Sequence, residues 1–216
     1  LSRYRRTQKE EAAAEVAKGS RRDLAQALAN GGIGAALAVA FAAYPDPLLF
    51  VAYVGVMAAV NADTWATELG VLSRDLPRLL TTGQEVPPGT SGGVTSLGFW
   101  ASLAGALLIG TTATALTQVQ SLLAGNGWRL EAVSFPILAV AGGLAGSLFD
   151  SLMGGTVQGI YYCDRCAKAT ERPVHHCGQT TLLVRGRAWL SNDVVNLAAS
   201  TVGGMIAVSL SWLFWR

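Results

Sequence analysis

Residues 61–70, NADTWATELG, directly follow the uncharged run PLLFVAYVGVMAAV (47–60), so that Asp63 and Glu68 interrupt an otherwise apolar segment. About 20 mostly apolar residues are enough to cross the hydrocarbon core of a bilayer as a helix. A charge at the bilayer centre costs about 2.5–3.5 kcal/mol on insertion scales, so acids in such a helix usually face a bundle interior or a wet cavity and serve a function. The stretch therefore predicts a transmembrane helix and a polar site within it.

The composition of the whole chain is typical of a membrane protein. Of its 216 residues, 51% are hydrophobic and 14% are charged, whereas about 25% of the residues of a soluble domain are charged. Four further windows, 24–44, 94–119, 132–158 and 194–215, are long and apolar enough to be spans. Backbone in lipid must satisfy its own hydrogen bonds, so we expect an all-α transmembrane bundle over residues 24–216. Because the chain begins at Leu1 rather than at a methionine, we take five spans as a lower bound.

Basic residues predict the orientation. Fourteen of the sixteen Lys and Arg residues lie in segments 1–23, 73–93 and 158–192. Five spans place these segments on one side, and the positive-inside rule predicts that this side is the cytoplasm, with 1–23 as a basic tail. We expect the plasma membrane of a prokaryote as the location and the lipid bilayer as the partner, while a homo-oligomer stays open. The net charge of +2 is too small to indicate nucleic-acid binding.

Acidic and amide side chains gather towards this predicted cytoplasmic side. They are Asp63 and Glu68 in the second span, Asp150 in the fourth, and Asp193 and Asn196 at the start of the fifth. The alternative is that some of them cap helix ends. For Asp193, the sequence supports an N-cap role and a catalytic role equally. Asp63 and Asp150 also precede similar glycine, loop and helix patterns, which suggests a parallel internal repeat.

The stretch TTGQEVPPGTSGGVTSLG (81–98) supplies a glycine-rich loop before the third span. Such backbone at a helix N-terminus can present N–H groups to an anion, here from Ser91, Gly92 and Gly93. It lacks the GK[ST] of a Walker motif, and a flexible connector is equally consistent with it. Carboxylates able to hold Mg²⁺ and five basic residues share its side, so the set predicts a nucleotide or diphosphate site. The basic residues are Lys18, Arg21, Arg22, Arg185 and Arg187.

All three cysteines and both histidines lie in YYCDRCAKATERPVHHCG (161–178). The spacing of Cys163, Cys166, His175 and Cys177 predicts a closed tetrahedral site for structural Zn²⁺, in which His176 could replace His175. Reduced cysteines or a disulfide are the alternatives, and a cytoplasmic location disfavours the disulfide. No feature indicates a catalytic thiol, because a base beside an acyl substrate would be needed.

Five stretches together resemble one family over nearly the whole chain. They are KGSRRDLAQALANGG, NADTWATELG, PRLLTTGQEVPPGTSGGVTSLG, AGSLFDSLMGGTVQ and WLSNDVVN. This is the integral-membrane family catalogued as domain of unknown function 92, which includes plant phytyl phosphate kinases and animal transmembrane protein 19. The resemblance implies phosphoryl transfer from a nucleoside triphosphate, CTP or ATP, to an isoprenoid monophosphate. A more distant similarity to dolichol kinases and membrane cytidylyltransferases is also present.

The residues and the resemblance lead to one hypothesis for the mechanism. Asp63, Asp150 and Asp193 would hold Mg²⁺, the basic residues of the tail would bind phosphate oxygens, and the glycine loop would cradle them. Glu68 and Gln84 would orient neighbouring groups, and Asn196 would contribute to cofactor binding. A transporter or scramblase, a non-catalytic scaffold and a cytidylyltransferase are the rival interpretations. The acids of a transporter should lie nearer the middle of the membrane.

Overall fold

Five long helices correspond to the five apolar windows of the sequence. The computed structural model describes residues 24–214, and its helices are α2 (Leu24–Ala43), α3 (Pro47–Gly70), α4 (Ser96–Leu123), α5 (Phe135–Thr156) and α6 (Asn192–Ser211). A short 3₁₀ helix, Glu131–Ser134, leads into α5. The five helical regions are long and apolar enough to cross a membrane. The expected all-α transmembrane bundle is therefore confirmed.

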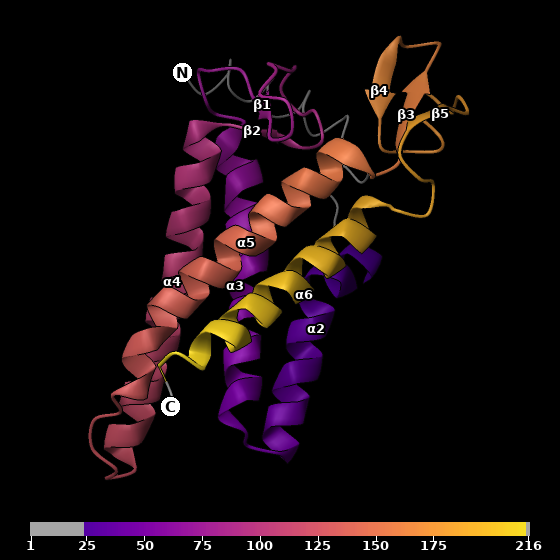
Figure 1. The fold of residues 1–216 in the computed structure, drawn as a ribbon. Coiled ribbons are helices and arrows are strands. Elements are labelled where there is room, and N and C mark those ends of the chain that lie inside the picture. Colours follow the sequence, from indigo (N-terminus) through magenta and orange to yellow (C-terminus); the bar gives the residue numbers. More distant parts are fainter. Residues whose placement is uncertain (1–23, 215–216) are drawn as a thin grey trace.

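Successive helices run in opposite directions, so both long connections come out at the same end of the bundle (Figure 1). Segments 71–95 and 157–191 lie at this end, which we call the loop end, and the short connections 44–46 and 124–130 lie at the other. Helix α3 is central, because it contacts each of the other four helices. This topology brings the ends of α3 and α5 and the start of α6 to the loop end.

Small residues let the backbones of α3, α5 and α6 approach closely. A Cβ added to Gly146 in α5 would lie 2.5 Å from the Cβ of Ala59 in α3 and 2.9 Å from the carbonyl oxygen of Ala199 in α6. A Cβ added to Gly203 in α6 would lie 2.9 Å from the carbonyl oxygen of Gly142 in α5. No larger side chain fits at these positions without moving a helix, so the glycines determine the spacing of the bundle.

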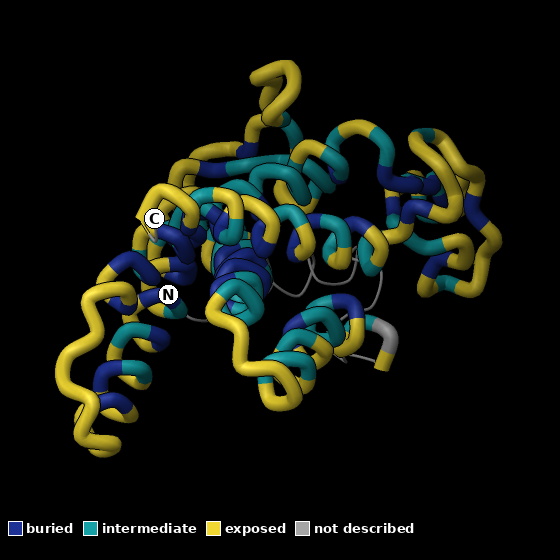
Figure 2. Tube along the Cα trace, turned by 60° about the horizontal axis from the view of Figure 1, so that its bottom comes forward, coloured by how far each residue is buried: buried dark blue, intermediate teal, exposed yellow. Residues whose placement is uncertain are grey.

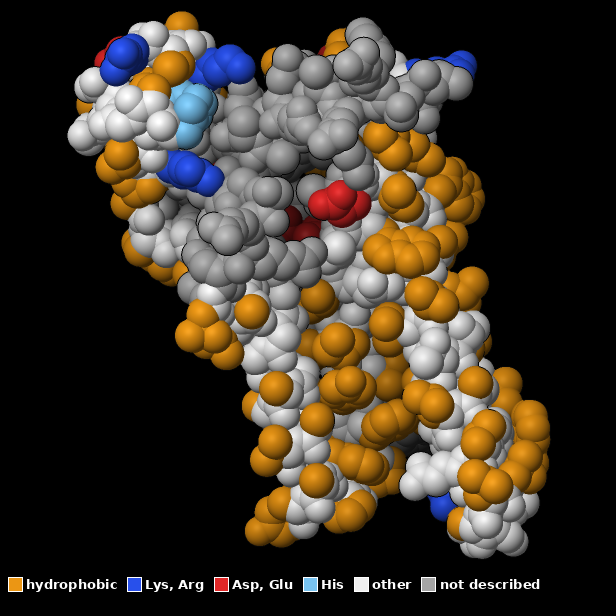
Figure 3. All heavy atoms as spheres, turned by 180° about the vertical axis from the view of Figure 1, so that it is seen from behind, with side chains coloured by type: hydrophobic (Ala, Val, Ile, Leu, Met, Phe, Trp, Pro, Cys, Tyr) orange, Lys and Arg blue, Asp and Glu red, His pale blue; other side chains and the backbone are white. Residues whose placement is uncertain are grey.

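The outer surface of the bundle is apolar, as lipid contact requires. Leu116, Leu123, Ile137 and Met205 are among the large apolar side chains that are more than half exposed. Buried residues gather where the helices face one another (Figure 2). Hydrophobic side chains cover the part of the bundle away from the loop end (Figure 3). This distribution places hydrocarbon, rather than water, around the helices.

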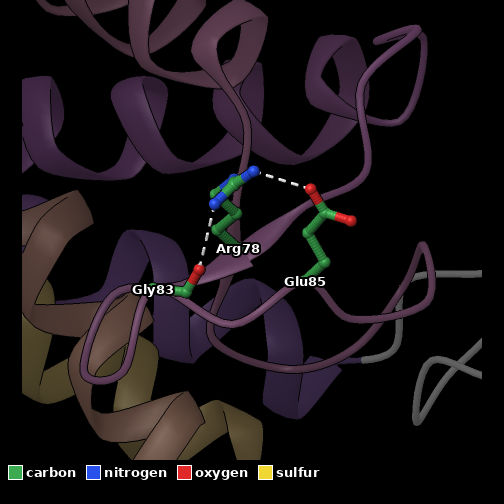
Figure 4. Close-up of polar contacts among 3 residues, drawn as sticks. All are labelled: Arg78, Gly83 and Glu85. Carbon is green, nitrogen blue, oxygen red and sulfur yellow. Dashed lines mark hydrogen bonds and ion pairs between the residues drawn. The ribbon is translucent and has the colours of Figure 1, made fainter.

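The first long connection is a folded loop, where the sequence also allowed a flexible connector. Its strands β1 (Arg78–Leu79) and β2 (Gly93–Val94) pair antiparallel. Arg78 donates from Nη2 to Oε1 of Glu85 over 2.6 Å and from Nη1 to the carbonyl oxygen of Gly83 over 3.4 Å (Figure 4). Both charged side chains are exposed, and such ion pairs contribute only about 0–1 kcal/mol. Backbone pairing therefore defines the loop more than the ion pair does.

The second long connection folds into a small sheet that the sequence analysis did not predict. Strand β3 (Ile160–Cys163) lies between β4 (Lys168–Thr170) and β5 (Leu182–Arg185), and both pairings are antiparallel. Tyr161 lies opposite Thr170 on one side and Leu183 on the other. The sheet lies beside the end of α5 (Figure 1). We refer to residues 160–187 as the β-unit.

Candidate functional site

Asp63 and Asp150 lie at one level of the bundle, on faces that meet. Ala59 of α3 and Gly146 of α5 are in close contact, and each aspartate follows its contact residue by four positions. Residues four apart lie on the same face of a helix, one turn further along. Because α3 and α5 both run towards the loop end, this turn brings the two aspartates together. The charge of Asp63 accordingly acts on Asp150.

The two aspartates are close to each other, and no basic side chain among residues 24–214 is paired with them. Both are half-buried, and Oδ2 of Asp150 is buried with no hydrogen-bond partner among residues 24–214. No Lys or Arg within that range forms an ion pair with either aspartate. Acidic side chains are visible on one face of the molecule near the loop end (Figure 3). Two close carboxylates repel each other unless a proton or cation compensates them, and oxygen ligands suit Mg²⁺.

Helix α6 brings Asn196 towards the same level. Ala199 packs at the contact between Ala59 and Gly146, and Asn196 precedes it by three residues, towards the loop end. Asp193 lies in the first turn of α6, and both side chains are half-buried. The N-cap residue is Ser191, so the structure does not give Asp193 the capping role that the sequence also allowed. Asp63 and Asp150 lie inside their helices and cap neither.

Glu68 and Gln84 are more exposed than this pair of carboxylates. Glu68 is exposed, and five residues of helix turn it by about 140° from the direction of Asp63. Gln84 lies in the β1–β2 loop with an exposed side chain. Glu68 therefore points in another direction from its helix than Asp63 does, and the orienting roles expected for Glu68 and Gln84 stay predictions.

The glycine-rich loop packs onto the end of α5. Gly92 has φ = +86°, and a Cβ there would overlap the backbone of Gly155 and lie 2.7 Å from the carbonyl oxygen of Ser151. Glycine is needed at this position both for its conformation and for its close approach. The backbone N–H of Gly93 is donated to the carbonyl oxygen of Thr90 over 3.0 Å. This N–H group is therefore already used, in contrast to the phosphate-binding role that we expected for it.

A polar network that the sequence analysis missed connects this loop to the β-unit. Ser91 Oγ donates to Oε1 of Gln158 over 3.1 Å, and Nε2 of Gln158 donates to Oε1 of Glu171 over 2.8 Å. Arg185 donates from Nη2 to the carbonyl oxygen of Gly154 over 2.6 Å. Burial lowers the pKa of Arg185, and the charge of Glu171 opposes this effect. Gln158 ends one of the stretches that carry the family resemblance, and Glu171 lies inside the cysteine-containing loop. Neither pattern indicated that the two side chains meet.

Glu171 extends the site towards the β-unit, because its charge also acts on Asp150. Two carboxylates from other parts of the chain, Asp63 and Glu171, therefore act on Asp150 near the loop end. Among the basic residues predicted for the site, Arg185 is half-buried, whereas Arg187 is exposed. Lys18, Arg21 and Arg22 lie outside the described residues, so their expected contact with phosphate stays a prediction.

The cysteine and histidine side chains of the β-unit form a second cluster. The ligand atoms of Cys163, Cys166, His175 and Cys177 lie within 4.8 Å of one another. Nδ1 of His175 lies 3.2 Å from Sγ of Cys177, and His176 is exposed instead. The hydrogen bond with His175 lowers the pKa of Cys177 to about 6, whereas hydrogen bonding with Cys177 raises the pKa of Cys166 to about 11. The four residues are a suitable donor set for zinc.

Two open hollows at the loop end are separate from the two aspartates. One, of about 330 Å³, is lined by Asp75, Arg78 and Glu85, and the other, of about 470 Å³, by Leu72, Asp75 and their neighbours. Neither is lined by Asp63 or Asp150. Arg78 and Glu85 compensate each other in the first hollow. We place the candidate site at the aspartates, whose charges have no such compensation among residues 24–214.

Comparison with known proteins gives matches over most of the chain. Residues 1–204 match the family described as integral membrane protein DUF92. Protein PGR of Arabidopsis thaliana is 33% identical over 86% of this chain and 67% of its own length. The uncharacterized membrane protein MJ0933 of Methanocaldococcus jannaschii is 33% identical over 87% of this chain and 61% of its own length. The chain thus spans about two thirds of these relatives, and no solved structure matches it.

Proposed function

The chain belongs to the integral membrane DUF92 family, and from this premise we propose that it is a membrane-embedded, Mg²⁺-dependent kinase. Its donor would be a nucleoside triphosphate, ATP or CTP, and its acceptor an isoprenoid monophosphate. The product would be an isoprenoid diphosphate. The resemblance of the sequence to phytyl phosphate kinases supports this choice of acceptor.

The observation that carries the proposal is the juxtaposition of Asp63 and Asp150 at one level of the bundle. Two half-buried carboxylates without a basic partner among residues 24–214 are unfavourable by themselves. A divalent cation bound between them would remove the repulsion and leave coordination positions for phosphate oxygens. A position near one end of the helices also suits a charged substrate whose polar part stays near water while its chain lies in lipid.

In the proposed reaction, an oxygen of the isoprenoid monophosphate attacks the γ-phosphorus of the nucleotide. A new phosphorus–oxygen bond forms, the bond between the γ-phosphorus and the β–γ bridging oxygen breaks, and the nucleoside diphosphate leaves with that electron pair. A phosphate oxygen is already a competent nucleophile, so no general base is needed. Asp63 and Asp150 would hold Mg²⁺, and positioning plus charge neutralisation would provide the acceleration.

Basic side chains at the loop end would complete the charge balance. Arg185 is half-buried near Gly154, and the tail residues Lys18, Arg21 and Arg22 would add further positive charge. Arginine suits phosphate because its planar guanidinium can form two parallel hydrogen bonds. Asp193 and Asn196, near the start of α6, would contact the metal or its water ligands.

The test is a transfer assay with purified protein in detergent or lipid nanodiscs. Phytyl monophosphate and Mg²⁺ are incubated with ATP or CTP labelled at either the α- or the γ-phosphate, and the lipid product is separated by thin-layer chromatography. We expect label from the γ-phosphate to appear in phytyl diphosphate. Label from the α-phosphate would instead establish cytidylyl or adenylyl transfer, and an absence of label from both would refute the proposal.

The acceptor chain can be tested in the same assay. Phytyl, geranylgeranyl and longer polyprenyl monophosphates differ in apolar length but share the reacting phosphate. A soluble short-chain alkyl phosphate serves as the control, since it retains the phosphate but lacks most of the apolar surface that would bind between helices. We expect a much higher KM for this control, with turnover at saturation reduced less.

A further inference from the structure

We propose that Cys163, Cys166, His175 and Cys177 bind one zinc ion, and that this ion holds Glu171 and Gln158 against the end of α5. Only the purpose of Glu171, which is to act beside the proposed Mg²⁺ site at Asp150, rests on the proposed function. The zinc site and its mechanical effect stand on the geometry of the β-unit.

The donor atoms already have the arrangement that a zinc ion needs. All four lie within 4.8 Å of one another, and Sγ of Cys163 lies 3.7 Å from Sγ of Cys177. Ligand atoms at about 2.0–2.3 Å from a tetrahedral zinc are separated by roughly this distance. The cysteines are free rather than disulfide-bonded. Three thiols and one imidazole leave no position open, which is typical of a structural rather than a catalytic zinc.

The β-unit needs such an ion because it has little core of its own. Its strands have three or four residues, and units of fewer than about 40 residues usually require a metal, disulfides or a partner. His175 and Cys163 are its most deeply buried side chains, at 2% and 0% exposure, while Leu182, Leu183 and Val184 are exposed. The centre of the β-unit is therefore the ligand cluster itself rather than a set of packed apolar side chains.

The position of Glu171 in the chain connects the cluster to the carboxylate site. Glu171 lies between Cys166 and His175, so a zinc bound to both pairs of ligands closes the loop that carries it. The adjoining backbone is also tied down, because Thr181 Oγ1 donates to the carbonyl oxygens of Arg172 and Pro173. From this closed loop Glu171 accepts a hydrogen bond from Gln158, and its charge acts on Asp150.

Gln158 connects Glu171 to the glycine-rich loop through hydrogen bonds. Its side chain is 1% exposed and hydrogen-bonds both Glu171 and Ser91. Loss of zinc would free Glu171, leave the buried amide of Gln158 without its acceptor, and loosen the contact between the glycine loop and α5. Glu171 and Gln158 are thus positioning residues that link a metal in the β-unit to the end of α5.

The first test is the metal content of the full-length chain, purified without added metal and measured by mass spectrometry. We expect about one zinc per chain. The Cys163→Ser/Cys166→Ser double variant and the His175→Ala variant should lose it, whereas the matched His176→Ala variant should keep it. Folded wild-type protein without zinc, or retention of zinc by His175→Ala together with its loss from His176→Ala, would overturn the assignment.

The second test measures positioning without using enzymatic activity. Hydrogen exchange is followed in peptides covering residues 88–94 and 150–160, with residues 135–145 of α5 as the internal control. We expect removal of zinc by a chelator to accelerate exchange in the first two peptides by about tenfold or more and to leave the control unchanged. Added zinc, but not added Mg²⁺, should restore protection. Unchanged exchange after zinc has been removed would overturn the positioning role.

A variant that keeps the zinc distinguishes the effect of Glu171 from the effect of the ion. Glu171→Ala should retain one zinc yet accelerate exchange in residues 150–160, whereas Asp164→Ala, which removes an exposed acid from the same unit, should change neither. An equal effect of both variants would overturn the role of Glu171. If the wild-type protein shows zinc and this exchange pattern but transfers no phosphate, the proposed function fails and the inference is supported.

Discussion

Replacement of Asp150 or Asp63 by asparagine removes one negative charge from the carboxylate pair and changes little else. Asparagine has nearly the same size, keeps hydrogen-bonding capacity and costs less than aspartate to place in a membrane helix. Both variants should therefore insert and purify normally. If Mg²⁺ binds between the two carboxylates, however, each substitution removes one of its charged ligands.

The size of the effect follows from Coulomb's law. At an effective dielectric constant of about 20, one charge about 4 Å from a divalent ion contributes roughly 8 kcal/mol. Dehydration of the ion and the carboxylate offsets at least half of this. A net loss of about 3–4 kcal/mol remains, which corresponds to a 10²–10³-fold weaker affinity for Mg²⁺. Turnover at limiting Mg²⁺ should fall by a similar factor, and excess Mg²⁺ should restore part of it.

The assay is γ-phosphate transfer to phytyl monophosphate as a function of Mg²⁺ concentration. Binding of Mn²⁺, followed by electron paramagnetic resonance, provides a measurement that needs no substrate. Asp75→Asn is the matched control, because Asp75 is an exposed acid at the loop end outside the proposed site. We expect it to keep wild-type metal affinity and turnover.

Near-normal Mg²⁺ dependence in both Asp63→Asn and Asp150→Asn would refute the metal-site reasoning. Loss of turnover with unchanged Mn²⁺ binding would refute it as well, since the aspartates would then act by some means other than holding the ion. In either case a proton or a basic side chain, rather than a metal ion, would compensate the two carboxylates.

Three further outcomes are expected. Gly92→Ala should destabilise the protein by about 2–4 kcal/mol in detergent unfolding assays, because it adds steric overlap with Gly155 to the cost of a positive φ. The matched Gly83→Ala, also at positive φ but with open space around it, should cost only about 1–2 kcal/mol. Gln118→Ala should cost about 1–3 kcal/mol, because the buried Gln118 side chain exchanges two hydrogen bonds with the backbone of Arg129, and the folded fraction should keep its transfer activity. Reporter fusions should place segments 71–95 and 157–191 on the cytoplasmic side and 124–130 on the opposite side; opposite locations of the two long segments would contradict a shared site.

Local features of the chain were predictable because their physical causes are local. The five helices follow from apolar runs whose backbones must form internal hydrogen bonds in lipid. The four donors of the metal cluster lie within fifteen residues, so their spacing alone indicated the chemistry. To predict that Asp63 and Asp150 lie near the same side of the membrane, one more step was needed. The count of spans places the ends of α3 and α5 on the same side.

Contacts between distant segments could not be predicted in this way. The sequence placed Glu68 and Asp63 in one stretch, and only the helix shows that the two side chains point about 140° apart. It assigned the N–H groups of Ser91, Gly92 and Gly93 to phosphate binding, whereas the N–H of Gly93 is donated within the loop. It also gave no sign that Gly92 packs against Gly155. These outcomes depend on the rotation and depth of each helix, which packing sets.

The sequence by itself determined that the chain is a membrane helix bundle with acids towards one end and a Cys₃His cluster in one loop, because apolar length, charge and ligand spacing are properties of short segments. Tertiary structure alone decided that Ser91, Gln158 and Glu171 form one chain of hydrogen bonds beside Asp150. Ser91 and Gln158 are 67 residues apart, and glycines at positions 92 and 154 let the loop that carries Ser91 approach the end of α5 closely enough for their contact. Directional bonds of this kind require atoms to be placed within a few tenths of an ångström, and only the packed bundle fixes positions so closely.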